Sequence, residues 1–252
     1  MLTGTDGAGA DGSLGRFTID TLFQGDALSL MQDLPDGCVD LIVTDPPFAI
    51  DFRAQRVNYN RTGSRVLEGY REVPPEEYAA FTRNWMEQAA RVLAPDGSMY
   101  VFSGWNRLID VLTGLDSAGL TTINHLIWKY QFGVFTRKKF VTSHYHILFA
   151  VKNPRRYCFN KIDHYPEDVW VINREYGKGK IKTPTKLPSA LVRKILAYSS
   201  REQDLVLDPF IGSGTVAIAC KEMGRHFLGF ELVDEYYAFA RARLADTASR
   251  RE

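Results

Sequence analysis

Apolar residues follow two patterns that alternate along most of the chain. Short runs rich in Val, Ile, Leu and Phe are typical of buried strands, and segments with an apolar residue every three or four positions are typical of helices packed on a sheet. The runs predict strands at 16–22, 39–44, 98–103, 121–128, 145–151, 205–207 and 226–230. The periodic segments predict helices at 26–34, 75–93, 106–117, 187–200, 214–223 and 235–244. This alternation indicates an α/β fold, a mostly parallel sheet with helices on both faces.

The composition is that of one large folded unit. The 252 residues are 45% hydrophobic and 24% charged, enough for a sizeable core and unlike a disordered chain or a disulfide scaffold. Cys38, Cys158 and Cys220 are isolated from one another, which indicates a reducing compartment and no structural zinc. No apolar run approaches the roughly 20 residues of a membrane span, and residues 1–15 lack the layout of a signal peptide. We expect a flexible tail at 1–15, a folded domain at 16–252 and a cytoplasmic location.

Positive charge is concentrated in one segment, although the net charge of the chain is only +1. Residues 129–182 carry twelve Lys or Arg and four Asp or Glu, so the segment is +8 and the remainder of the chain is −7. Aromatic residues are interleaved with these cations. The combination is typical of a nucleic-acid interface, since cations contact phosphates and flat rings stack on exposed bases. A solvated surface is the alternative interpretation.

The segment 205–215 (LVLDPFIGSGT) joins a predicted strand to a predicted helix. Asp208 follows the strand, Gly212 and Gly214 precede the helix, and Glu231 ends the next predicted strand. Glycine lets the backbone approach a ligand, and a carboxylate at the tip of the second strand can accept hydrogen bonds from ribose hydroxyls. This layout predicts a nucleotide-type cofactor site, with a plain connecting turn as the alternative. It is not the dinucleotide fingerprint, because residue 217 is Ala.

The segment 45–48 (DPPF) directly follows the predicted strand at 39–44. An exocyclic amine of a nucleobase is a poor nucleophile because its lone pair is delocalised into the ring. The Asp45 carboxylate and a proline carbonyl can accept both N–H hydrogens of such an amine, and two prolines fix that geometry in advance. The ring of Phe48 can stack on an extruded base. The segment therefore predicts amine chemistry on a base, with an ordinary Asp-Pro turn as the alternative.

Together, these two segments closely resemble the S-adenosylmethionine-dependent DNA amino-methyltransferases. The catalytic segment comes before the cofactor segment with the basic segment between them, as in the β group of that family. The resemblance extends over about 18–244. It implies the class I methyltransferase (Rossmann-like) sheet, circularly permuted, with an inserted target-recognition segment at about 129–182.

The resemblance assigns roles to individual residues. It implies that the catalytic residues are Asp45, Pro46, Pro47 and Phe48, and it implies no metal. It implies that the cofactor, S-adenosyl-L-methionine, is bound by Asp26, Ala27, Lys182, Thr183, Thr185, Asp208, Pro209, Phe210, Gly212, Ser213, Gly214, Thr215, Glu231 and Leu232. Residues 127–129 and 143–146 resemble the strand pair beside the base pocket. Trp128 there is a pocket or a core residue.

DNA contacts are expected from the basic segment and from a long mobile loop at 49–73, which we expect to close over the extruded base. The candidate DNA-binding residues are Arg53, Arg56, Arg137, Lys138, Lys139, Arg155 and Arg156.

The resemblance implies a site-specific methyltransferase that acts on a flipped base in double-stranded DNA. Asp rather than Ser before the prolines favours N6 of adenine, and N4 of cytosine is the alternative. Lesser alternatives are an RNA or protein-amide methyltransferase and a catalytically inactive DNA-binding relative. A homodimer and a cognate restriction endonuclease are further partners that the resemblance leaves open.

Overall fold

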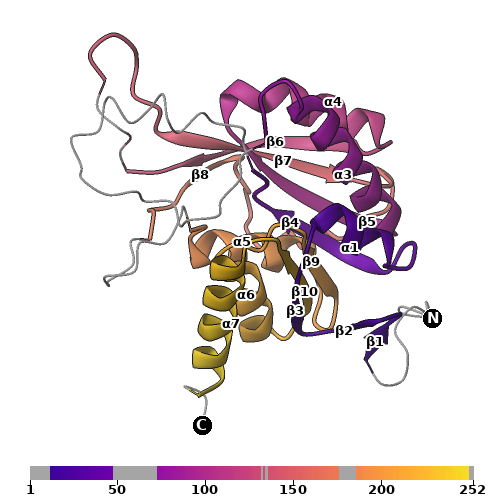
Figure 1. Ribbon diagram of the computed structural model, residues 1–252. Coiled ribbons are helices and arrows are strands. Elements are labelled where there is room, and N and C mark those ends of the chain that lie inside the picture. Colours follow the sequence, from indigo (N-terminus) through magenta and orange to yellow (C-terminus); the bar gives the residue numbers. More distant parts are fainter. Residues whose placement is uncertain (1–11, 48–72, 132, 134–135, 176–185, 250–252) are drawn as a thin grey trace.

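An eight-stranded sheet runs through the protein in the order β3-β10-β9-β4-β5-β7-β6-β8 (Figure 1). The computed structural model describes residues 12–47, 73–131, 133, 136–175 and 186–249. The strands of the sheet are β3 (Thr21–Gln24), β4 (Val39–Thr44), β5 (Leu93–Ser103), β6 (Thr121–Lys129), β7 (His144–Val151), β8 (Val169–Val171), β9 (Leu205–Asp208) and β10 (His226–Glu231). Strand β7 is antiparallel to β5 and β6, and the other neighbouring pairs are parallel. The predicted α/β class with a mostly parallel sheet is confirmed.

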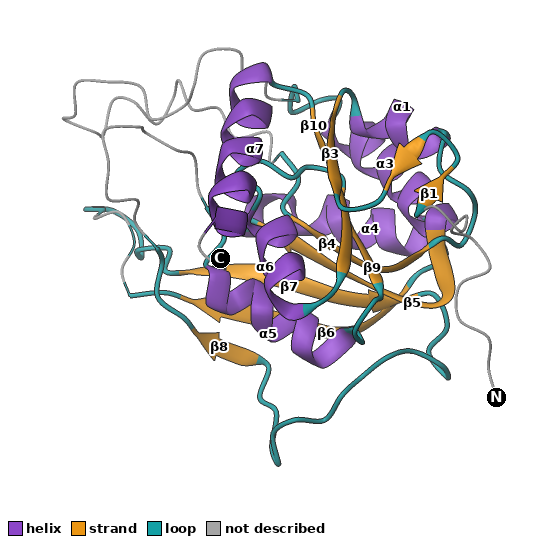
Figure 2. Ribbon diagram, turned by 90° about the horizontal axis from the view of Figure 1, so that it is seen from below, coloured by secondary structure: helices purple, strands orange, loops and turns teal. Residues whose placement is uncertain are grey.

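Helices cover both faces of this sheet (Figures 1 and 2). One layer consists of α1 (Ala27–Gln32), α3 (Tyr78–Val92) and α4 (Leu108–Ser117), which follows a short 3-10 turn at Trp105–Arg107. The other consists of α5 (Ser189–Ser199), α6 (Thr215–Met223) and α7 (Asp234–Ser249). Successive strand residues point to opposite faces, so Ile42 packs in the first core and Val43 in the second. None of the described helices is long and apolar enough to cross a membrane.

The strand order places a topological switch point between β4 and β9. Strand β4 is paired with β5 on one side and with β9 on the other, and β9 is paired with β10 in turn. The chain thus proceeds from β4 in one direction across the sheet and from β9 in the opposite direction. In open parallel sheets, ligands bind outside the carboxyl ends of strands at such a switch point.

The beginning of the chain differs from the predicted single strand at 16–22. Strand β1 (Ser13–Leu14) pairs with β2 (Phe17–Thr18), and a turn with Asp20 at φ +62° separates them from β3. Leu14 is buried in the core. The flexible tail predicted at 1–15 therefore extends too far, because the apolar side chain of Leu14 is already packed.

Two further differences concern the middle of the chain. Strand β5 begins at Leu93 rather than at 98. The residues between Leu93 and Ser98 form a bulge, since Val39 pairs with Leu93 and Leu41 pairs with Ser98. Strand β8 was not predicted, since three residues are too short for a pattern. It pairs Trp170 with Trp128 at the edge of the sheet. Because β7 and β8 both lie within 129–182, that segment is not a separate insertion.

A substitution at Gly229 tests the packing at the centre of the β3–β10–β9 ladder. A Cβ atom there would lie 2.7 Å from Leu22 Cδ2 and 2.9 Å from Ile211 Cγ1. We expect Gly229→Ala to lower the free energy of unfolding by about 1–3 kcal/mol, as overpacking does in cores. Urea denaturation measures it.

Gly104→Ala is the matched control. Gly104 has φ −75°, and its added Cβ would meet only the end of the Asn106 side chain. We expect this variant to unfold at a urea concentration close to that of the wild type. Equal stability of the two variants would contradict the tight packing around Gly229.

Candidate active site

Three carboxylates lie at the carboxyl ends of neighbouring strands. Asp45 directly follows β4, Asp208 ends β9 and Glu231 ends β10. The N–H of Gly25, which follows β3, donates to the Glu231 carbonyl at 2.9 Å, so the end of the outer strand is joined to the same edge. The parallel sheet therefore gathers the acidic residues of both sequence motifs at the topological switch point between β4 and β9.

The loop after β9 is held in one conformation by backbone contacts. The Phe210 N–H donates to Asp208 Oδ1 at 3.1 Å, and the Ile211 N–H donates to the Phe230 carbonyl at 2.9 Å. Gly214 begins α6 at φ +77°, and its added Cβ would lie 3.1 Å from that of Ala240. Gly212 has φ +49° but faces open space, with the nearest atom to an added Cβ at 3.8 Å. Helix packing thus requires Gly214, whereas Gly212 leaves room beside the loop for a ligand.

Glu231 joins the ends of the loop and the strand. Its Oε2 accepts the Gly212 N–H at 3.0 Å, and its Oε1 accepts the Val233 N–H at 2.9 Å. Burial raises the pKa of Glu231, and these backbone N–H groups oppose the shift. Both oxygens retain further lone pairs, so the carboxylate can accept hydrogen bonds from a ligand as well.

Negative charge is costly at this edge of the sheet. Burial raises the pKa of Asp208 to about 8; the Phe210 N–H opposes the shift, and the charges of Asp45 and Glu231 add to it. Burial also raises the pKa of Asp45 to about 7, and the positive charge of Arg174 opposes this. A ligand with positive charge would relieve the repulsion among the carboxylates. S-adenosylmethionine carries a sulfonium and an ammonium group, so these residues fit that cofactor.

The other residues predicted to bind the cofactor form two groups: those available to a ligand and those that support the surrounding structure. The side chain of Leu232, the residue after Glu231, is 58% exposed, so it can pack against a flat ligand. The Ser213 and Thr215 hydroxyl oxygens lie 3.1 Å apart on the loop. Asp26 instead caps α1, with Oδ2 accepting the Ser29 N–H at 2.9 Å.

Ala27 and Pro209 are buried, and the Phe210 ring packs edge-on against Trp85 of α3 with a centroid separation of 5.5 Å. These three side chains support the loop and α1. The remaining predicted residues, Phe48, Lys182, Thr183, Thr185, Arg53 and Arg56, lie outside the described residues, as does the loop at 49–73 except for its last residue.

An aromatic cluster that was only partly predicted lies on the other side of Asp45. Trp128 stacks on Tyr145 with a centroid separation of 5.7 Å, and Tyr130 lies 5.5 Å from Trp128. Arg174 lies over the Tyr130 ring. Burial raises the pKa of Tyr78 on α3 to about 12, and the charge of Asp45 adds to this shift. Trp128 was singled out as a pocket or core residue, but Tyr130 and Arg174 were counted only within the basic segment.

The predicted DNA-binding residues do not form one surface. Arg137, Lys138 and Lys139 are exposed on the connection between β6 and β7, which leaves the sheet at the same edge as Asp45. Arg155 and Arg156 follow the end of the antiparallel strand β7, at the opposite edge. Arg156 is paired there with Asp96 at 3.8 Å. Arg155 and Arg156 therefore lie apart from the other three residues, because β7 returns the chain across the sheet, and their role in DNA binding stays a prediction.

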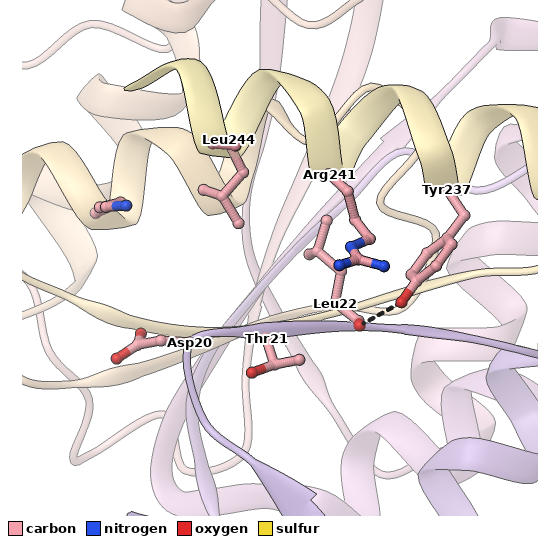
Figure 3. Close-up of a pocket in the computed structure, with 8 residues that line it drawn as sticks. Asp20, Thr21, Leu22, Tyr237, Arg241 and Leu244 are labelled. Carbon is pink, nitrogen blue, oxygen red and sulfur yellow. Dashed lines mark hydrogen bonds between the residues drawn. The ribbon is translucent and has the colours of Figure 1, made fainter. Parts of the chain in front are cut away.

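A hollow between β3 and α7 is separate from this site. It is lined by Asp20, Leu22, Arg241 and Leu244, and by Tyr237, whose hydroxyl donates to the Leu22 carbonyl at 3.2 Å (Figure 3). Its strand residues belong to the beginning of β3, whereas the carboxylates cluster where the strands end. The hollow is therefore a feature of the flank of the sheet.

Asp208→Asn tests the electrostatics of the site. A carboxylate whose pKa is raised on folding stabilises the protein at low pH, and this stability is lost as pH rises through the folded pKa. We therefore expect Asp208→Asn to reduce the loss of stability between pH 5 and pH 8, measured by urea denaturation. Its affinity for S-adenosylmethionine, measured by calorimetry, should fall at least tenfold.

Asp40→Asn is the matched control on β4. Burial raises the pKa of Asp40 to about 6, and its Oδ2 accepts the Leu205 N–H at the beginning of β9, far from the carboxyl ends. This variant should also reduce the loss of stability with pH, but it should leave cofactor affinity unchanged. If Asp208→Asn binds S-adenosylmethionine as tightly as the wild type, Asp208 does not belong to the cofactor site.

Comparison with known proteins agrees with this geometry. The model of a DNA methylase family matches residues 39–242. The chain is 28% identical to the Type II methyltransferase M.HpaI of Haemophilus parainfluenzae, over 88% of this chain and 73% of that protein. It is 29% identical to the Type II methyltransferase M.BglII of Bacillus subtilis, over 88% and 68%.

Solved structures show the same fold. The structure of M1.HpyAVI in complex with SAM matches with a TM-score of 0.66 and 26% identity, over 88% of this chain and 98% of that one. The cytosine-N4-specific PvuII DNA methyltransferase matches with a TM-score of 0.70 and 19% identity, over 91% of both chains. The family match covers both acidic motifs and the sheet that joins them. The chain therefore belongs to the N6/N4 DNA methylase family and is an S-adenosylmethionine-dependent DNA amino-methyltransferase.

Proposed function

We propose that the protein methylates N6 of adenine in double-stranded DNA. The observation that carries the proposal is the position of Asp45, at the end of β4 between the cofactor loop of β9 and the cluster of Trp128, Tyr130 and Tyr145. Trp128 and Tyr130 are buried, so we propose that they support the half-buried Tyr145, beside which a base would approach the Asp45 carboxylate. Asp rather than Ser before the prolines favours adenine. N4 of cytosine is the second candidate, because the cytosine-specific PvuII enzyme has the same fold.

The chemistry follows from the groups at the end of β4. The Asp45 carboxylate and the Pro46 carbonyl accept the two N–H hydrogens of the amine, which favours a tetrahedral nitrogen with an available lone pair. The two prolines hold these acceptors in place before the substrate binds, so no reorganisation is needed in the transition state. The cofactor, when bound, supplies the methyl group. The methylated nitrogen is strongly acidic, so its proton passes to Asp45 or to solvent without a further base.

The cofactor is assigned to the edge formed by β9, β10 and β3. Glu231 would accept hydrogen bonds from the ribose hydroxyls, Leu232 would pack against the adenine, and Gly212 leaves space for the ligand. Asp208 holds the loop through the Phe210 N–H, and the positive charge of a bound cofactor would favour its ionised form. Lys182, Thr183 and Thr185 remain the proposed contacts at the methionine end.

The named relatives and the cysteines support proposals about the biological setting of the protein. The Type II names of two relatives support a restriction–modification pair, in which a cognate endonuclease recognises the same sequence. Cys38, Cys158 and Cys220 are free and buried, which supports the reducing environment of the cytoplasm. A homodimer stays a prediction.

Asp45→Asn tests the catalytic assignment. The amide keeps the shape of the side chain but loses one acceptor and the charge, so we expect methyl transfer to fall at least 100-fold with cofactor affinity within a few-fold. In the wild type, kcat/KM should fall about tenfold for each pH unit below about 7, because protonation of Asp45 removes the acceptor.

Transfer of a labelled methyl group to DNA, followed by digestion to nucleosides, measures the rate and identifies the product. Asp40→Asn, the same change earlier in β4, is the control and should retain activity. Substantial activity in Asp45→Asn would refute the catalytic assignment. Label in N4-methylcytosine would show that the target base is cytosine and not adenine. In parallel assays with RNA or protein, label there together with none in DNA would refute DNA as the substrate.

The exposed cations Arg137, Lys138 and Lys139 are proposed to contact DNA phosphates. Each neutralised phosphate contributes roughly 0.9 to the slope of log affinity against log salt. Replacing all three by Ala should weaken DNA binding and lower that slope by up to about 3, while the preference for a sequence largely persists. Binding titrations at several salt concentrations measure this.

The double variant of Arg155 and Arg156 is the control for this surface. These residues lie at the opposite edge of the sheet, so their replacement by Ala should change the salt slope little. An unaltered slope in the triple variant would show that the cations between β6 and β7 are only solvated.

A further inference from the structure

Helix α7 packs directly on the loop that joins β9 to α6. An added Cβ of Gly214 would lie 3.1 Å from that of Ala240, so the helix leaves no room for a side chain at this point of the loop. Arg243, about one turn further along α7, is half-buried and reaches the same loop. On β10, the Glu231 carboxylate accepts the N–H of Gly212. The loop is therefore held from β10 and from α7.

The guanidinium of Arg243 donates two hydrogen bonds to this loop. Its Nη1 donates to the Ser213 carbonyl and, at 3.4 Å, to Thr215 Oγ1. Its Cζ lies 5.8 Å from the centroid of the Phe239 ring. Burial lowers the pKa of Arg243, and the charge of Glu175 opposes this shift. Hydrogen bonds from a charged, partly desolvated guanidinium are stronger than those between neutral groups.

The peptide between Ser213 and Gly214 is fixed at both of its polar atoms. Its carbonyl accepts the hydrogen bond from Arg243. Its N–H points the opposite way, because the peptide is trans, and donates to the Ile211 carbonyl at 2.9 Å. The peptide plane cannot rotate without breaking both bonds. Arg243 is therefore the side chain that sets the orientation of this peptide.

The contact with Thr215 orients the hydroxyl groups of the loop. A guanidinium can only donate, so Thr215 Oγ1 is the acceptor of the bond from Arg243. The Thr215 hydroxyl can then donate to Ser213 Oγ at 3.1 Å, which leaves the Ser213 hydroxyl hydrogen for a ligand. Arg243 thus acts on one carbonyl and one hydroxyl group of the loop.

We propose that Arg243 is a positioning residue for the cofactor site: by holding the Ser213 carbonyl and the Thr215 hydroxyl, it keeps the turn at 212–214 in the conformation that receives S-adenosylmethionine. The inference rests on the proposed placement of the cofactor at this loop. Without Arg243 the turn can leave that conformation, since its two glycines permit many others. A ligand that requires one conformation binds more weakly in proportion to the fraction of molecules that have it.

The test compares Arg243→Met with Arg243→Lys. Calorimetry without DNA measures the affinity for S-adenosylmethionine and for S-adenosylhomocysteine, and both should be about tenfold weaker in Arg243→Met. In methyl-transfer assays the KM for the cofactor should rise about tenfold while kcat stays within about threefold, because saturating cofactor restores the turn. Arg243→Lys should recover part of the affinity, since an ammonium group can still donate to the Ser213 carbonyl.

Hydrogen exchange of the protein without cofactor measures the turn itself. In Arg243→Met, the amides of the peptide 209–215 should exchange several times faster than in the wild type, whereas those of β4 should exchange at the wild-type rate. Equal acceleration in both peptides would mean that the variant only lowers the global stability, which would overturn the proposal.

Arg241→Met is the matched control on the same helix. Arg241 is exposed, its Cζ lies 5.6 Å from the centroid of the Tyr237 ring, and it lines the hollow between β3 and α7 (Figure 3). Its replacement should leave the cofactor affinity and the exchange of the peptide 209–215 unchanged. If Arg243→Met is unfolded at the assay temperature, Arg243→Gln removes the same charge with a polar side chain.

The outcomes separate the two proposals. If Asp208→Asn and Arg243→Met both bind S-adenosylmethionine as tightly as the wild type, the proposed placement of the cofactor is refuted. If Asp208→Asn binds more weakly but a folded Arg243→Met or Arg243→Gln does not, the role of Arg243 alone is overturned. An equal loss of affinity in Arg241→Met would also overturn it, because the effect would not depend on the bonds to the loop. Because calorimetry uses no DNA, label found only in cytosine would refute the proposed target base and leave the role of Arg243 intact.

Discussion

Strands β4 and β9 lie side by side and run in the same direction, with Leu41 paired to Val206 and Ile42 to Leu207. Because the pairing is parallel, the residues that leave the two strands emerge at the same edge. Asp45 and Asp208 are far apart in the sequence, and this register brings them into electrostatic contact. Helices α1, α3 and α4 cover one face of the sheet, and α5, α6 and α7 cover the other (Figure 2). Every other feature of the site is arranged around this edge.

The same register creates an electrostatic problem. Asp45, Asp208 and Glu231 share a poorly solvated edge, and burial raises the pKa of each. Backbone N–H groups from Phe210, Gly212 and Val233 offset part of this for Asp208 and Glu231. For Asp45 the compensation comes from Arg174. On one side of Asp45, the carboxylates of Asp208 and Glu231 favour a positively charged ligand. On the other side, the positive charge comes from Arg174.

Much of the fold could be predicted from local patterns. The strand at 39–44 was predicted with its observed bounds, and the cofactor loop was located between a strand and a helix as predicted. These segments have strong signals, because buried parallel strands are continuous apolar runs and glycines mark the loop. Local patterns failed at the start of β5, where a bulge joins Leu93 to the strand predicted from 98, and at β8, where three residues gain their structure only by pairing with β6.

The sequence by itself determined the α/β class, the order of the two motifs along the chain and the chemistry that Asp45, Asp208 and Glu231 can perform. These properties follow from residue type and spacing, which act over short distances in the chain. Tertiary structure alone decided that Arg174 lies over Tyr130 and that Arg155 and Arg156 lie at the far edge. The direction of β7 and the pairing of β8 set both positions. Strand direction and edge pairing depend on contacts between distant segments, and no local pattern of hydrophobic residues records them.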